Sequence, residues 1–143
     1  IQEDIPNVRI YFIGNNQVDQ LLREQKGLYG KMVFYLGETT EPYGYVKNAD
    51  YLILPSRWEG LPMVVLEALA LGTKVIAADT ANVKAFADEH NVYLYKQGNA
   101  DDLLHVLHQA YENKLNRVYF DLTPFSPERV GEKMFALYQK ICH

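Results

Sequence analysis

The sequence is poor in cysteine, since Cys142 is the single one among 143 residues. One cysteine cannot close a disulfide within the chain, which excludes a small secreted fold held together by disulfides. Long apolar runs are missing too, because none reaches the roughly 18 residues that a membrane-spanning helix needs. We therefore expect a cytoplasmic protein.

The first residues lack the features of a complete or exported protein. Residues 1–4 contain neither the basic nor the apolar segment of a secretory signal, and there is no initiator methionine. We expect the sequence to be a piece excised from a longer protein. Any peripheral association with the inner face of a membrane would then depend on the missing part.

An excess of positive charge is also absent. Lysine and arginine together number 14 against 18 acidic residues, which gives a formal net charge of −4. This balance excludes the basic surface of a nucleic-acid-binding protein. The chain does have 48% hydrophobic residues and no repetitive tract, which suits one globular domain over residues 1–143.

Short apolar strands alternate with amphipathic helices along the sequence. Strands that are apolar on both sides are typical of a parallel sheet with both faces covered. The pattern therefore predicts an α/β fold, a Rossmann-like open parallel sheet with helices on both faces. We expect strands at 8–13, 32–36, 51–54, 75–78 and 92–95, and helices at 16–28, 42–48, 62–71, 83–89 and 100–114.

A last helix, over residues 126–142, is set apart from the others. Ser126 suits its N-cap and Pro127 its first turn. The stripe along this helix either covers the edge of the sheet or meets a missing part of the protein. This apolar stripe consists of Val130, Met134, Leu137, Tyr138 and Ile141.

The segment 54–72 carries the strongest functional signal. Ligands of open parallel sheets bind at the C-terminal ends of the strands. Here a strand ends at Pro55, a polar loop follows, and a helix begins near Pro62. The first amides of a helix have no partner within it and attract anions. We expect a ligand to meet the free N–H groups near Gly60, Leu61, Met63 and Val64.

Glu67 is the only charged residue between Leu61 and Thr73. The helix around it is apolar on nearly every face, as buried helices are. A carboxylate buried there without a partner would cost several kcal/mol, so Glu67 needs one. Glu67 either bonds backbone amides or sits on a narrow hydrated edge, or it accepts hydrogen bonds from the hydroxyls of a ligand.

Three pairs in this segment, Pro55-Ser56, Glu59-Gly60 and Glu67-Ala68, stand at a distinctive spacing. The pattern resembles that of the group 1 retaining glycosyltransferases, which carry a glutamate, seven residues and a second glutamate in this setting. The resemblance is to their C-terminal, donor-binding domain and runs from about Val8 to the final helix. It implies the GT-B fold, in which two Rossmann-like domains face each other.

The resemblance implies roles for individual residues. Glu59 would lie near the donor sugar as the catalytic residue, and Glu67 would bind the ribose hydroxyls of the nucleotide. Arg57 would either counter phosphate charge or pair with Glu59. The other donor-binding residues would hold sugar or phosphate oxygens or border the base, and they are Gly14, Leu36, Gly37, Ser56, Gly60, Leu61, Met63 and Val64.

By the same resemblance the full-length protein is a hexosyltransferase of polysaccharide biosynthesis. It would move a hexose from a nucleoside-diphosphate sugar to an acceptor hydroxyl with retention of configuration, and it would need no metal or other cofactor. A missing N-terminal domain would bind the acceptor, which is a glycan, a lipid-linked molecule or another acceptor. Helix 126–142 would cross to that domain, and the isolated chain would be inactive.

Two loops depart from the family pattern. The sequence Gly14-Asn15-Asn16 lacks a second glycine, and residues 79–82 replace a glycine-rich turn and a later glutamate. These departures leave open a degenerate nucleotide-binding or interaction domain without catalysis. Half of a nucleotide-sugar epimerase is a further alternative, because such enzymes share the two-domain arrangement.

Two other kinds of site find less support. Glu38 follows Gly14 at about the distance expected of a dinucleotide-binding acid, but the glycines of G-x-G-x-x-G are missing. His105 and His108 lie on one expected helix, facing away from its apolar stripe of Leu103, Leu107, Ala110 and Tyr111. We therefore expect neither a nicotinamide site nor a metal site.

Overall fold

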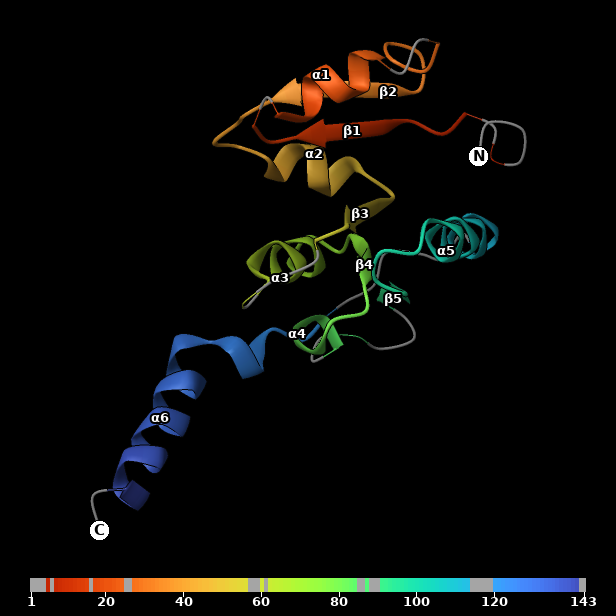
Figure 1. Cartoon of the computed structure of the whole chain (residues 1–143). Coiled ribbons are helices and arrows are strands. Elements are labelled where there is room, and N and C mark those ends of the chain that lie inside the picture. The colour runs from red at the N-terminus through yellow and green to blue at the C-terminus, as the bar shows by residue number, and fades with distance from the viewer. Residues whose placement is uncertain are drawn as a thin grey trace.

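The computed structural model in Figure 1 describes residues 5, 7–15, 17–24, 27–56, 60, 62–84, 87, 91–113 and 120–141. Strands and helices alternate over most of this length, as the sequence predicts. The elements are β1 (Ile10–Ile13), α1 (Gln17–Glu24), β2 (Val33–Gly37), α2 (Tyr43–Asn48), β3 (Tyr51–Leu54), α3 (Met63–Ala70), β4 (Lys74–Ala78), α4 (Ala81–Lys84), β5 (Val92–Tyr95), α5 (Ala100–Glu112), the 3₁₀ turn η1 (Thr123–Phe125) and α6 (Pro127–Ile141).

All strand pairs among these elements are parallel, which confirms the predicted α/β class. The strands form two sheets, one of β1 and β2 and the other in the order β3-β4-β5. Val75 of β4 is aligned with Leu52 of β3 on one side and with Val92 of β5 on the other. Figure 1 shows the strands following one another across the molecule as β2, β1, β3, β4 and β5.

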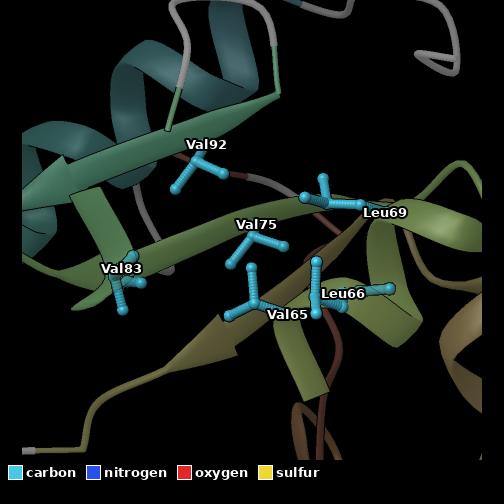
Figure 2. Packing of buried hydrophobic residues seen from close by; sticks show 8 residues of the cluster. Val65, Leu66, Leu69, Val75, Val83 and Val92 are labelled. Atoms are coloured by element: carbon cyan, nitrogen blue, oxygen red, sulfur yellow. The ribbon is translucent and has the colours of Figure 1, made fainter. Parts of the chain in front are cut away.

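Strand β4 is the centre of the core, since all five of its residues are buried. Its side chains alternate between two clusters because successive residues of a strand face opposite sides. Val75 and Ala77 belong to the first cluster, with α3, α4 and β5, and Figure 2 shows Val75 among the side chains of these elements. Ile76 and Ala78 belong to the second cluster, with Tyr95 and α5. Helices therefore cover both faces of this sheet.

Helix α3 begins after the buried Pro62 and has a well-defined end. Gly72 adopts φ 75°, a left-handed conformation that glycine tolerates best. The N–H of Gly72 donates to the carbonyl of Leu69 at 3.0 Å, and the N–H of Thr73 donates to that of Ala68 at 2.9 Å. This is a Schellman motif, which satisfies carbonyls that the helix end would otherwise leave unpaired.

Some element boundaries differ from the sequence-based ones. Helix α4 starts at Ala81 instead of 83, because the Thr80 hydroxyl accepts the N–H of Val83 at 3.4 Å and caps the helix two residues earlier. The rest of the helix expected at 83–89 lies largely outside the described residues. Helix α5 starts as expected after Asn99, whose side chain accepts the N–H of Asp102 at 3.0 Å.

Helix α6 begins where the sequence predicts, with the Ser126 hydroxyl accepting the N–H of Arg129 at 3.3 Å. Its predicted apolar stripe is not covered by any described residue of the chain, since exposure rises from 42% at Val130 to 69% at Ile141. Figure 1 shows the helix projecting away from both sheets. The stripe therefore does not cover the edge of either sheet. None of the helices among the described residues is long and apolar enough to span a bilayer.

Candidate functional site

One face of α3 and the turn before α6 border an open hollow of about 480 Å³. Met63, Leu66, Glu67 and Ala70 line it from α3. These positions follow the i, i+3, i+4, i+7 spacing of a single helix face. The opposite wall comes from a segment more than fifty residues later in the chain, consisting of Leu122, Thr123, Phe125 and Ser126.

Glu67 is the only charged side chain among the described residues that line this hollow. It is half-buried, on the flank of a helix whose other face is fully packed. No described residue donates a hydrogen bond or forms an ion pair with its carboxylate. Of the possibilities open for Glu67, bonding to backbone amides is therefore not realised in the part of the chain that the structure describes. A hydrated edge and a ligand hydroxyl both remain compatible with its position.

The hollow combines this acceptor with apolar walls and two residues that carry hydroxyls. Thr123 and Ser126 lie on the wall opposite α3, where the Ser126 hydroxyl also accepts the N–H of Arg129. Met63 is 54% exposed and Phe125 is 36% exposed, so both offer apolar surface to a ligand. A few polar groups set in apolar surface are typical of sites for small organic molecules. Sequence patterns did not identify Thr123 or Phe125 as site residues, since nothing local indicates that their segment folds back on α3.

Part of the segment expected to bind an anion is described at the start of α3. Gly60 is exposed, and Ser56 and Val64 are half-buried. The first turn of the helix contains no acidic residue that would oppose a bound anion. Glu59, Arg57 and Leu61, which the sequence also implicates, lie outside the described residues.

A second group of predicted residues meets at the C-terminal ends of β1 and β2. The N–H of Gly14 donates to the carbonyl of Gly37 at 3.0 Å, and the hydroxyl of Tyr35 donates to the carbonyl of Gly14 at 2.9 Å. Burial raises the pKa of Tyr35 above its ordinary value. Leu36 is 37% exposed beside them. The structure thus brings Gly14, Leu36 and Gly37 together, but none of them lines the hollow at Glu67.

The loop after β4 is held by its own contacts. The side chain of Asp79 forms an ion pair of 2.9 Å with Lys84, and both side chains are more than one-third exposed. Such a surface pair contributes little to stability. The N–H of Asp79 donates to the carbonyl of Tyr95 at 2.8 Å, which fixes the loop against β5.

The two histidines of α5 differ in their exposure to solvent. His105 is exposed and His108 is half-buried, while the buried positions of the helix are Val106 and Ala110. Among the residues that the structure describes, no group of three or more His, Cys, Asp or Glu side chains could hold a metal ion. Val106 was missing from the predicted stripe, although its spacing from Leu103 and Ala110 fits one helical face.

A family model and a curated relative both match this chain. Residues 1–121 match the family model of the glycosyl transferases group 1. The chain is 27% identical over 116 residues to the N,N'-diacetylbacillosaminyl-diphospho-undecaprenol alpha-1,3-N-acetylgalactosaminyltransferase of Campylobacter jejuni, covering 76% of this chain and 31% of the relative.

Solved structures show the same fold. Anabaena HepE, crystallised in complex with UDP, aligns with a TM-score of 0.68 at 20% identity over 78% of this chain and 33% of HepE. The structure of TarM aligns with a TM-score of 0.70 at 21% identity over 96% of this chain and 30% of TarM. The chain thus spans about a third of the length of each of these proteins.

Proposed function

The chain belongs to the group 1 glycosyl transferases, and we propose that it forms the domain that binds a nucleoside-diphosphate sugar. In this proposal it is one half of a GT-B enzyme that transfers a hexose to an acceptor hydroxyl with retention of configuration. The observation that carries the proposal is the position of Glu67, a carboxylate without a described partner on the face of α3 that lines the hollow. The UDP bound to Anabaena HepE supports a nucleotide as the ligand.

The chemistry of the hollow suits the ribose of such a nucleotide. A carboxylate accepts two hydrogen bonds from neighbouring hydroxyls, and these bonds are stronger than those to a neutral acceptor. In this proposal Glu67 holds the ribose, and the unpaired amides at the start of α3 hold phosphate or sugar oxygens. Glu59 and Arg57 act on the sugar and phosphate side, as the motif implies. Gly14, Leu36 and Gly37 border the base.

The acceptor would bind to a second domain. We assign the whole enzyme to the assembly of polysaccharides or lipid-linked glycans, as the name of the Campylobacter jejuni relative suggests. The exposed apolar stripe of α6 is then the surface that crosses to the second domain, since it stays uncovered by the described residues. Residues 1–143 alone are expected to bind the donor without transferring its sugar.

Ligand-detected NMR and calorimetry with UDP, GDP and ADP, each free and as its sugar conjugate, test the donor site. The chain should bind one nucleotide class, and Glu67→Ala should weaken binding by about 1–3 kcal/mol, or roughly 5- to 150-fold in Kd, by removing hydrogen bonds to a charged acceptor. Glu112→Ala, an exposed glutamate at the end of α5, is the matched control and should bind like the wild type.

Two results would contradict the proposal. Equal nucleotide affinity in the Glu67→Ala variant would remove Glu67 from the site. Failure of every nucleotide to bind would instead favour a degenerate domain that serves as an interaction module. Comparing the free nucleoside with the diphosphate separates the contribution of the ribose from that of the α3 amides.

A further inference from the structure

Tyr35 joins the ends of β1 and β2 through its side chain. Its hydroxyl donates to the carbonyl of Gly14 at 2.9 Å, although the two residues are 21 positions apart in the sequence. The N–H of the same glycine donates to the carbonyl of Gly37 at 3.0 Å. Both backbone polar groups of Gly14 are therefore bonded to β2, one to a side chain and the other to the backbone.

The end of β2 contains a β-bulge between Tyr35 and Gly37. Phe12 of β1 is aligned with Tyr35, but the next residue, Ile13, is aligned with Gly37. Leu36 is therefore the extra residue of the bulge, and its side chain is 37% exposed. Bulges are frequent next to active sites, where they redirect a side chain. This bulge leaves an apolar side chain exposed at the C-terminal end of the strand.

The two glycines at this end of the sheet leave room for a ligand. Apart from the adjacent residues of the chain, no described residue has an atom within 4 Å of the point where a side chain would begin at Gly14 or at Gly37. Their φ values of 146° and 80° are ones that glycine tolerates best, and a glycine also lets another molecule approach the backbone closely. Ligands of open parallel sheets bind at this end of the strands.

The loop after β1 needs a contact that fixes its course. Gly14 follows Ile13, the last residue of β1, so its carbonyl lies beyond the strand. The loop continues with Asn15 and Asn16 and lacks a second glycine. The bond that the structure shows at the Gly14 carbonyl is the one from the Tyr35 hydroxyl. The side chain of Tyr35 thus determines where the loop leaves the sheet.

The charged neighbours of Tyr35 are bonded to one another. Burial, followed by the charge of Asp19, raises the pKa of Tyr35, so its hydroxyl lies on the side of α1. One carboxylate oxygen of Asp19 accepts from Arg23 at 2.8 Å, and the other accepts from the hydroxyl of Tyr29 at 3.1 Å. The Arg23 guanidinium also lies over the ring of Tyr29, 5.3 Å from its centre. These contacts hold α1 to the segment before β2, while the hydroxyl of Tyr35 bonds Gly14.

We propose that Tyr35 is a positioning residue that selects the nucleobase, because it sets through the Gly14 carbonyl how a base fits beside Gly14, Leu36 and Gly37. This inference rests on the proposed function, in which those three residues border the base. A shift of the loop would change the space that the base enters and therefore the preference for one base over another. Glu67 and the first amides of α3 would be unaffected, since α3 packs on the other sheet.

Hydrogen exchange tests the positioning without any ligand. Tyr35→Phe removes the hydroxyl and keeps the ring. The amide of Gly14, which bonds Gly37 in the same loop, should then exchange about two- to tenfold faster, as expected when one neutral hydrogen bond is lost. Tyr29→Phe is the matched control, because it removes a half-buried hydroxyl that bonds Asp19 and should leave the Gly14 amide unchanged.

Calorimetry with UDP, GDP and ADP tests the selection of the base. We expect the wild type to prefer one of the three nucleotides. In Tyr35→Phe the ratio of the Kd of a disfavoured nucleotide to that of the favoured one should fall by about two- to tenfold. Tyr29→Phe should keep the wild-type ratio. A purely structural role of Tyr35 would weaken all three nucleotides equally and leave the ratio unchanged.

Three outcomes would overturn the inference. Unchanged exchange of the Gly14 amide in Tyr35→Phe would show that the hydroxyl does not hold the loop. An unchanged base preference in this variant would overturn the inference alone, since the wild type would still bind its nucleotide as the proposed function requires. A wild type that binds no nucleotide would overturn the proposed function and base selection together. Faster Gly14 exchange and an altered base preference, both confined to Tyr35→Phe, support the proposal.

Discussion

Lys74 can be used to measure how much a buried amine destabilises the core of this domain. It begins β4 and is only 3% exposed, and its amine has no hydrogen-bond partner in the structure as described. Burial lowers the pKa of Lys74 below its ordinary value, because the charged form loses its hydration. We expect Lys74→Met to raise the free energy of unfolding at pH 7.

The size of the effect follows from what the substitution removes. A buried donor without a partner costs about 1–3 kcal/mol relative to its hydrated state, and more when it is charged. Methionine keeps an unbranched chain of similar length, so the packing of the lysine stem against the sheet is largely retained. We therefore expect a stabilisation of about 1–3 kcal/mol from Lys74→Met.

The effect has a defined pH dependence. Below the folded-state pKa of Lys74 its penalty is fully present, and it disappears as pH rises toward the unfolded-state value of 10.5. Between these two pKa values the unfolded chain binds more protons than the folded chain. The free energy of unfolding of the wild type therefore rises by at most about 1.4 kcal/mol per pH unit. Lys74→Met lacks this rise, so its advantage over the wild type should shrink as pH increases.

Two buried tyrosines titrate in a similar pH range and change stability in the opposite direction. Burial raises the pKa of Tyr51 to about 12 and raises that of Tyr95 as well. The stability that these two protonated hydroxyls contribute is present below about pH 10. It is lost as pH rises through the folded-state pKa of each tyrosine. Because wild type and variant share these tyrosines, the difference between the two proteins isolates Lys74.

Urea unfolding followed by circular dichroism between pH 7 and 10.5 provides the measurement. Lys31→Met is the control, since Lys31 is exposed and its replacement should change stability by less than about 0.5 kcal/mol. A Lys74→Met variant no more stable than wild type at pH 7 would contradict the burial penalty assigned to the Lys74 amine. A stability difference between the two proteins that stays constant with pH would contradict it as well.

Two further substitutions test how the helices are held. Gly72→Ala should destabilise the domain by about 1–2 kcal/mol, because Gly72 has φ 75° in the Schellman turn; a thermal melt that matches wild type would contradict this. Asn99→Ala should lower the free energy of unfolding by about 0.5–2 kcal/mol, because it removes the N-cap of α5. Asn48→Ala is the control with a smaller expected loss of stability, since it removes only a hydrogen bond to the carbonyl of Gly44 inside the short α2.

The parts of the fold that depend on local patterns could be predicted from the sequence. Apolar runs identified the five strands that the described residues form, and Pro62 and Gly72 marked the two ends of α3 because their effects act on the adjacent backbone. The unusual charge of Glu67 within an apolar helix singled it out as a residue that faces something other than the core. Its place on the hollow agrees with that expectation.

The parts that depend on distant contacts could not be predicted in the same way. Periodicity gives no information on which strands pair, so the division into two sheets was not foreseen. The second wall of the hollow comes from residues around Thr123, which carry no motif of their own. The start of α4 shifted because a single hydroxyl, that of Thr80, caps the helix. Capping depends on a side-chain rotamer as well as on residue type.

The position of Glu67 follows from the packing of α3 as much as from its own chemistry. Val65, Leu66, Ala68 and Leu69 are all buried, and together they fix the rotation of the helix on β4. With 3.6 residues per turn, fixing those four leaves Glu67 at the flank, one turn after Met63. A binding residue held by a rigid element needs little further ordering when its ligand arrives. Under the proposed function, the core under α3 therefore contributes to ligand affinity through the orientation of Glu67, although none of Val65, Ala68 or Leu69 lines the hollow.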